Sequence, residues 1–283
     1  MVKSNKVFQG DNLSVLKSIK NNSIDLIYVD PPFNTGVIQT RKLKKVKKSD
    51  KGTITGFKGH TYELEDAGSY SYSDSYYNFL DFLKPRLVEA KRVLAKGGTL
   101  YVHLDFREVH YVKVFLDTLF GRENFLNEII WAYDYGGKAK TKWPTKHDTI
   151  LVYVKDIKNY YFSSETVDRE PYMAPGLVTK EKAQRGKLPT DVWWHTIVPP
   201  TGKEKTGYPT QKPLGILKRI IVASSRPQDT VLDFFAGSGT TGEAAATLDR
   251  HFILVDENPE AVLVIRKRFA ARMPQIPIEY IET

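Results

Sequence analysis

A glycine-rich loop between two short apolar strands constrains the fold more than any other part of this sequence. The strand pattern of residues 230–235 runs into the loop Ala236 to Gly242, a helix of small residues follows, and the apolar strand 252–255 ends in Asp256. This order predicts a strand–helix–strand unit, which is the building block of parallel α/β sheets. In open α/β sheets, ligands bind beyond the carboxyl ends of the strands. We therefore expect a binding site at this loop.

The glycine spacing leaves the kind of ligand open. Gly237-x-Gly239-x-x-Gly242 satisfies the dinucleotide-binding fingerprint, and Asp256 follows at nearly the distance expected for an acid that binds a ribose. On this motif alone, a nicotinamide-dependent oxidoreductase is a fair interpretation. An adenosyl cofactor without phosphates fits as well, because neither the glycines nor the acid requires a pyrophosphate. Close packing of a helix on a strand is the third explanation.

A second apolar strand, residues 25–29, ends in the turn Asp30-Pro31-Pro32-Phe33. Each proline fixes its own φ and lacks a backbone N–H, so the chain cannot continue there as a helix or a central strand. The turn therefore offers a carboxylate and an aromatic face together. A planar base could donate hydrogen bonds from an exocyclic amino group to Asp30 and the Pro31 carbonyl while it stacks on Phe33. A turn with a half-buried phenylalanine is the alternative.

The composition limits the class of protein. The chain has 283 residues, 41% of them hydrophobic and 27% charged, which fits one large domain with an insertion or two small domains. Its formal net charge of +9 favours a polyanionic partner or an acidic surface. The absence of cysteine excludes disulfides, thiolate metal sites and cysteine nucleophiles. No apolar stretch approaches the length of a membrane span, so we expect a cytoplasmic protein that binds no membrane.

Two segments interrupt the α/β pattern. Residues 37–60 contain eight cations and one acid, and we expect a mobile basic loop that is either solvated or in contact with nucleic-acid phosphates. Between residues 121 and 213, aromatic and cationic residues interleave, which suits stacking on a nucleic acid and equally suits the core of a β-rich subdomain. His147 and His195 are each more often structural than catalytic, and no spacing groups them into a metal site. Near the amino terminus, Asp11 or Asn12 is the expected N-cap of a helix.

Taken in order, these motifs resemble those of the amino-methylating DNA methyltransferases of bacterial restriction–modification and orphan methylation systems. The resemblance spans nearly the whole chain, and the order of the motifs is similar to that of the permuted group called β. It implies that Asp30, Pro31, Pro32 and Phe33 form the catalytic loop and that S-adenosylmethionine is the cofactor. The residues that the resemblance assigns to cofactor binding are Asp11, Lys212, Asp233, Phe235, Ala236, Gly237, Ser238, Gly239, Thr240 and Asp256.

The resemblance also implies a fold and a domain organisation. The fold is a doubly wound, mostly parallel seven-stranded α/β sheet with helices on both faces and an inserted target-recognition region. We expect a catalytic half over residues 1–120 with a mobile basic loop over 37–75, the target-recognition region over 121–208, and the cofactor-binding half over 209–283. Double-stranded DNA is the implied partner. Dimers are common in the family, so a homodimer stays open.

The implied reaction is methylation of the exocyclic amino group of a flipped base. Asp at the first position of the turn favours N6 of adenine, with N4 of cytosine as the alternative. RNA and protein-glutamine methyltransferases use a similar turn, but the large middle segment disfavours them. A nicotinamide oxidoreductase would leave the Asp-Pro-Pro-Phe turn without a task. A catalytically silent DNA-binding subunit would keep the basic surface, but no motif in the sequence is damaged.

Overall fold

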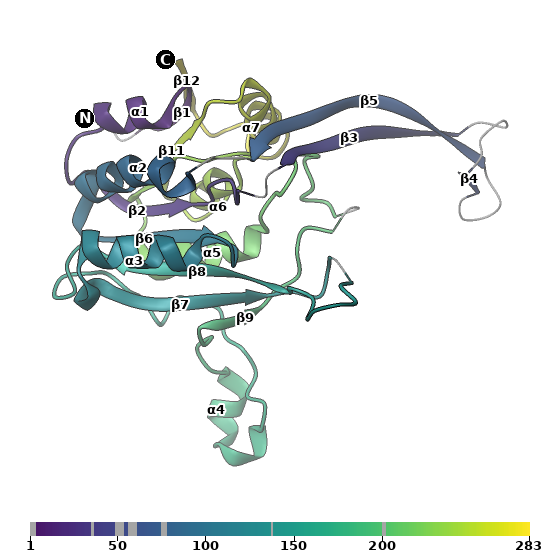
Figure 1. Ribbon diagram of the computed structural model, residues 1–283. Coiled ribbons are helices and arrows are strands. Elements are labelled where there is room, and N and C mark those ends of the chain that lie inside the picture. Colours follow the sequence, from purple (N-terminus) through teal and green to yellow (C-terminus); the bar gives the residue numbers. More distant parts are fainter. Residues whose placement is uncertain are drawn as a thin grey trace.

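The computed structural model describes residues 4–34, 37–48, 54–55, 61–74, 78–136, 138–199 and 202–283. Its centre is a sheet with the strand order β12-β1-β11-β10-β2-β6-β8-β7-β9 (Figure 1). These strands are β1 (Asn5–Gln9), β2 (Ile24–Val29), β6 (Leu94–Leu104), β7 (Phe125–Ala132), β8 (His147–Val154), β9 (Val192–Trp194), β10 (Thr230–Asp233), β11 (His251–Asp256) and β12 (Ile278–Glu282). Only β8 runs antiparallel to its neighbours within this described sheet.

The predicted fold class is confirmed, because the sheet is open and mostly parallel. It differs from the prediction in size, since the described residues form nine strands in this sheet where we expected seven. The short β9 and the carboxyl-terminal β12 lie at the two edges and account for the difference. Strand β12 pairs with β1 at the opposite end of the chain, a partnership that no local pattern reveals.

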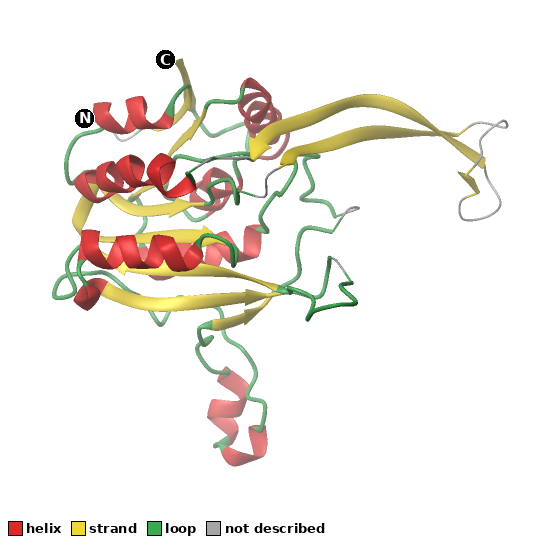
Figure 2. Cartoon of the chain, in the orientation of Figure 1, coloured by secondary structure: helices red, strands yellow, loops and turns green. Residues whose placement is uncertain are grey.

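Helices cover both faces of the sheet (Figures 1 and 2). One face carries α1 (Asn12–Ser18), α2 (Phe79–Val93) and α3 (Val109–Phe120), and the other carries α5 (Leu214–Ser224), α6 (Thr240–Thr247) and α7 (Pro259–Arg272). In β2, Ile27 and Val29 enter the first core, whereas Leu26 and Tyr28 enter the second. Successive side chains of a strand point to opposite faces, so this apolar strand needs cover on both sides. No helix within the described ranges is long and apolar enough to cross a membrane.

The stretch that we expected to be a mobile basic loop contains strands instead. Strands β3 (Val37–Lys48) and β5 (Thr61–Asp74) form an antiparallel hairpin with β4 (Ile54–Thr55) beside β5; residues 49–53 and 56–60 lie outside the described residues. Three register positions place a lysine opposite an acid: Lys44 and Asp66, Lys45 and Glu65, and Lys47 and Glu63. Opposite charges at facing positions favour antiparallel pairing. The acids come after residue 60, so a charge count over 37–60 missed them.

The expected target-recognition region, residues 121–208, is only partly separate from the sheet. After the 3-10 turn Arg122–Asn124, its strands β7 and β8 extend the central sheet beside β6, so the boundary at residue 121 does not coincide with an edge of the sheet. The part of the region that includes the 3-10 turn Pro175–Leu177 and α4 (Lys180–Arg185) extends away from the sheet, below β9 in Figure 1. The role of this region in target recognition stays a prediction.

A buried ion pair fixes α6 against α7. The Arg268 guanidinium donates to Glu243 at 2.7 Å, and both side chains are almost fully buried. Arg272 donates to the second carboxylate oxygen of Glu243 at 2.8 Å. Since α6 follows the glycine loop and α7 follows Asp256, this pair ties together the helices behind two parts of the predicted site.

We expect Glu243→Met to lower the free energy of unfolding by about 3–5 kcal/mol, because the Arg268 charge would stay buried without its partner. The double variant Glu243→Met/Arg268→Met removes both charges and should recover most of that loss. Urea unfolding of the parent and both variants measures the difference. A double variant that is as unstable as the single one would show that the loss comes from packing and not from the unpaired charge.

Candidate active site

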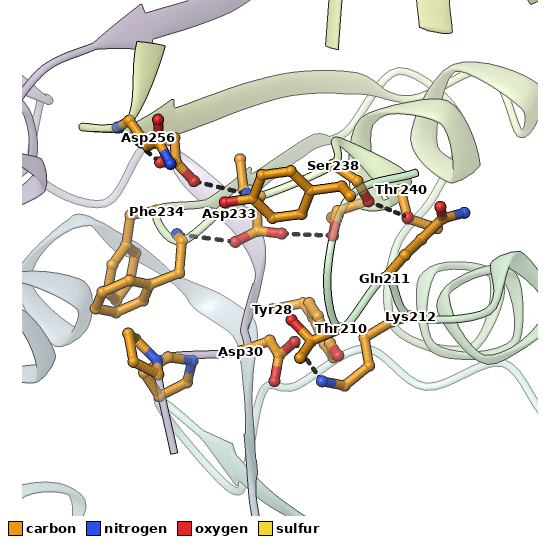
Figure 3. Close-up of a pocket in the computed structure, with 18 of the residues that line it drawn as sticks. Tyr28, Asp30, Thr210, Gln211, Lys212, Asp233, Phe234, Ser238, Thr240 and Asp256 are labelled. Carbon is orange, nitrogen blue, oxygen red and sulfur yellow. Dashed lines mark hydrogen bonds and ion pairs between the residues drawn. The ribbon is translucent and has the colours of Figure 1, made fainter. Parts of the chain in front are cut away.

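A cavity at the carboxyl ends of β2, β10 and β11 brings most of the predicted site residues together (Figure 3). It is lined by the whole turn Asp30 to Phe33, by residues of the glycine loop, by Asp256 and by Lys212. Of the predicted residues, Asp11 and Gly239 do not line it. The lining residues that sequence reasoning missed are Asn12, Tyr28, Phe82, Arg86, Tyr208, Leu217, Glu257 and Asn258.

The glycine loop takes its shape from two backbone conformations and one carboxylate. Gly237 and Gly239 have φ angles of 49° and 74°, in the left-handed region that other residues adopt at a cost of about 1–2 kcal/mol. A Cβ atom on Gly239 would lie 2.8 Å from Cγ1 of Ile265, so Gly239 shapes the loop from behind the cavity wall. Asp256 holds the loop by accepting the Gly237 N–H at 2.7 Å and the Asn258 N–H at 2.9 Å.

Asp233, the last residue of β10, is buried beneath this loop. It accepts hydrogen bonds from the Thr241 hydroxyl at 2.5 Å and from the Phe235 N–H at 3.0 Å. Burial nevertheless raises the pKa of Asp233 to about 7, and the charges of Asp30 and Asp256 act in the same direction. Burial also raises the pKa of Asp256 to about 6. A cation that enters the cavity would favour the ionised forms of both carboxyl groups.

Asp30 follows β2 directly, and its two carboxylate oxygens have different surroundings. Oδ2 accepts a hydrogen bond from the Lys212 ammonium at 2.5 Å. Oδ1 is buried and has no hydrogen-bond partner within the described residues. A buried carboxylate oxygen without a donor costs free energy. The geometry therefore leaves Oδ1 available to a donor from outside the chain.

A buried polar network supports the Asp-Pro-Pro-Phe turn from the neighbouring strands. His103 of β6 is fully buried, with its Nδ1 2.8 Å from the Tyr28 hydroxyl and its Nε2 3.2 Å from the Asp148 carboxylate. Tyr133 donates to the other oxygen of Asp148 at 3.0 Å. Burial alone would raise the pKa of Asp148, but the hydrogen bonds from His103 and Tyr133 help to bring it below its ordinary value. The His103 ring lies 6.0 Å from the ring of Phe33, so the network reaches the turn itself.

Asp11 lies outside the cavity wall but is connected to it through Arg86. Its carboxylate caps α1 by accepting the Ser14 N–H at 2.9 Å, as one of the two expected N-caps, and it pairs with Arg86 at 3.0 Å. The Arg86 guanidinium carbon lies 3.9 Å from the centroid of the Phe82 ring, which is 6.0 Å from that of Phe235. Asp11 thus positions an aromatic wall of the cavity. Its predicted contact with the cofactor stays a prediction.

Comparisons with known proteins agree on one family. A family model described as DNA methylase matches residues 24–267. The chain is 34% identical over 264 residues to the DNA adenine methyltransferase YhdJ of Escherichia coli K12, covering 90% of this chain and 79% of that protein.

Solved structures show the same fold. The M1.HpyAVI–SAM complex superposes with a TM-score of 0.59 at 21% identity, covering 93% of this chain and 98% of that chain. The cytosine-N4-specific PvuII DNA methyltransferase superposes with a TM-score of 0.63 at 17% identity, covering 95% and 87%. At these identities the likeness is evidence of the fold alone.

We expect the raised pKa values of Asp233 and Asp256 to make the ligand-free protein less stable as the pH rises. Both carboxyl groups have a higher pKa in the folded chain than the unfolded value of about 3.9. Their contribution to stability is therefore complete below about pH 4 and is lost as the pH rises through 6 and 7. Asp233→Asn should remove the larger part of this loss.

Urea unfolding at a series of pH values from 4 to 8 tests this expectation. The free energy of unfolding of Asp233→Asn, relative to the parent, should rise by up to about 4 kcal/mol across that range, since about three pKa units are involved. Asp249→Asn, an exposed acid outside the cavity, is the control and should follow the parent. Parallel pH curves for the parent and Asp233→Asn would contradict the expectation.

Proposed function

Because the chain belongs to the DNA methylase family, it is a DNA methyltransferase, and we propose that it methylates N6 of adenine in double-stranded DNA with S-adenosylmethionine as the donor. The observation that carries this proposal is Asp30 Oδ1, a buried acceptor that has no partner in the described structure and lies in the same cavity as the glycine loop. An exocyclic amino group is a donor of the required kind.

Adenine is favoured over cytosine by two observations. The turn begins with Asp30, the residue that the family resemblance associates with adenine, and the relative YhdJ is named an adenine methyltransferase. The PvuII enzyme, which is specific for N4 of cytosine, shares the fold. The fold therefore does not distinguish the two bases, and methylation of N4 of cytosine stays the alternative.

The residues of the cavity fit S-adenosylmethionine. Asp233 and Asp256 suit the sulfonium and ammonium cations of this cofactor, whereas the pyrophosphate of a nicotinamide cofactor would add negative charge beside the same two carboxyl groups. Phe82 and Phe235 offer rings against which an adenine can pack, and Asp256 can accept from ribose hydroxyls. When bound, the cofactor supplies a methyl carbon that its positively charged sulfur activates.

The Asp-Pro-Pro-Phe turn acts on the amino nitrogen of the flipped base. This nitrogen is a poor nucleophile while its lone pair is delocalised into the ring. Hydrogen bonds from its two hydrogens to Asp30 Oδ1 and the Pro31 carbonyl favour a tetrahedral nitrogen whose lone pair points at the methyl carbon. Attack of this nitrogen on the methyl carbon would break the carbon–sulfur bond and leave a positive charge on the nitrogen. The nitrogen would then release one of its protons to solvent by way of Asp30. Phe33 stacks on the base and offsets its lost stacking in the duplex.

We propose that DNA lies against the side of the sheet formed by the carboxyl ends of the parallel strands, where β2 ends. Figure 1 shows the β3–β5 hairpin and the loop between β7 and β8 extending from this side. That loop contains Lys138, Lys140, Lys142 and Lys146, and its Trp143 is 93% exposed. Lysines can pair with phosphates and an exposed indole can stack on a base, which suits this surface to DNA. Phosphate contacts by the lysines of the hairpin stay a prediction.

Three further expectations are parts of this proposal. They are a homodimer, action in the cytoplasm, and a place in a restriction–modification system. The last of these is supported by the name of a relative of this chain, the type II methyltransferase M.HpaI of Haemophilus parainfluenzae.

Asp30→Ala should lower the rate of methyl transfer by about 10²–10³-fold, because the acceptor for the amino group is lost from a preorganised site. The affinity for S-adenosylmethionine should change little. Mass spectrometry of nucleosides from DNA incubated with the protein and the cofactor should show N6-methyladenine for the parent and for the control Glu165→Ala, an exposed acid outside the cavity. N4-methylcytosine alone would overturn the base assignment, and a fully active Asp30→Ala would overturn the mechanism.

Asp256→Ala should weaken the binding of S-adenosylmethionine by about 1.5–3 kcal/mol, since a charged acceptor for the ribose hydroxyls is removed. Calorimetry measures this loss. Glu257→Ala is the matched control, because Glu257 also lines the cavity but makes no predicted ribose contact. Asp256 also holds Gly237, so Asp256→Asn, which keeps an acceptor for that N–H, should lose less. If Asp256→Ala binds as tightly as the parent, the placement of the ribose is wrong.

A further inference from the structure

Lys212 contacts the catalytic turn twice, although the sequence resemblance assigned it to the cofactor. Its ammonium lies 2.5 Å from Asp30 Oδ2 (Figure 3). The same ammonium lies 4.7 Å from the centroid of the Phe33 ring. The side chains of Lys212 and Asp30 are only 10% and 17% exposed. An ion pair with so little contact with solvent is screened weakly and has a defined geometry.

The segment that carries Lys212 is itself tied down. The buried side chain of Gln211 accepts the Thr206 N–H at 2.9 Å and donates to the Glu204 carbonyl at 2.7 Å. On the other side of Lys212, the first amide of α5, that of Leu214, donates to the Glu204 carboxylate at 3.1 Å. Hydrogen bonds on both sides therefore fix the backbone from which the lysine reaches Asp30.

We propose that Lys212 is a positioning residue for Asp30, which it binds through Oδ2 so that Oδ1 alone is presented to the target amino group. The inference rests on the proposed function. Two observations carry it, namely that one oxygen of Asp30 is bound by Lys212 and that the other is buried without a partner among the described residues. An ion pair at one oxygen restrains rotation of the carboxylate, because rotation would break the pair, and it thereby sets the angle at which the other oxygen meets the amino group. By its contact with Phe33, the same ammonium restrains the ring on which the base stacks.

This role assigns Lys212 to the transfer step and not to cofactor affinity. Asp30 shares the cavity with Asp233 and Asp256, and like charges at short distance repel each other. The Lys212 ammonium offsets this repulsion at Asp30 and keeps its carboxylate directed to the place where the base enters. A misplacement of about 1 Å at a reacting centre costs on the order of 100-fold in rate.

The test compares Lys212→Met, Lys212→Gln and Lys212→Arg with the parent in single-turnover methylation at saturating DNA and S-adenosylmethionine. Lys212→Met should lower the rate by about 100-fold while the Kd for S-adenosylmethionine, measured by calorimetry, stays within about two-fold. Lys212→Arg keeps a cationic donor and should recover at least about ten-fold of the loss. Lys212→Gln keeps a donor without charge and should fall between the two. Lys218→Met, on α5 and outside the cavity wall, is the matched control and should behave like the parent.

Three other outcomes overturn the inference. A raised Kd for S-adenosylmethionine with an unchanged rate at saturation makes Lys212 a cofactor ligand, and an unchanged rate and Kd make its contact with Asp30 irrelevant. Equal losses in all three variants, with no recovery in Lys212→Arg, would indicate a merely structural lysine. A parent that binds S-adenosylmethionine but methylates no DNA would contradict the proposed function instead.

Discussion

Three carboxyl groups meet at the ends of adjacent parallel strands, and the surrounding structure is arranged to compensate their mutual repulsion. Asp30, Asp233 and Asp256 end or directly follow β2, β10 and β11. Each has its own compensation: an ammonium at Asp30, a hydroxyl and an amide at Asp233, and two backbone amides at Asp256. The compensation is incomplete, because Oδ1 of Asp30 has no hydrogen-bond partner in the part of the chain that the structure describes. A site of this kind attracts a cationic methyl donor and a neutral amine, and it disfavours a pyrophosphate.

The rest of the fold holds these groups in place from two sides. On one face the pair Arg268–Glu243 fixes α6 to α7, the helices behind the glycine loop and Asp256. Within the sheet, His103 connects Tyr28, which lies two residues before Asp30, with Asp148 of β8. The strands β7 and β8, which we had expected in a separate region, therefore contribute directly to the support of the Asp-Pro-Pro-Phe turn. The loop between β7 and β8, which belongs to the region predicted to recognise the target, begins within a few residues of that support.

The parts of the site that could be predicted from the sequence are those formed by residues that are consecutive in the chain. The Asp-Pro-Pro-Phe turn, the glycine loop and the acid that ends β11 are local features, since consecutive residues determine their backbone conformation. Contacts between distant segments were not predictable in this way. Arg86 reaches the cavity from α2. Lys212 was assigned to the cofactor on the family resemblance, and its contact with Asp30, 182 positions away in the sequence, leaves no local pattern. The hairpin was missed for the same reason, because the acids that face its lysines come from the returning strand.

The raised pKa values of Asp233 and Asp256 make the measured heat of ligand association depend on the buffer. With pKa values of about 7 and 6, Asp233 and Asp256 keep part of their protons near neutral pH while the cavity holds no cation. A cationic ligand stabilises the ionised forms, so its association must release protons to the solution. Those protons are taken up by the buffer, whose own ionisation enthalpy is added to the heat of association. The apparent enthalpy therefore differs between phosphate and amine buffers, and the difference counts the protons that leave.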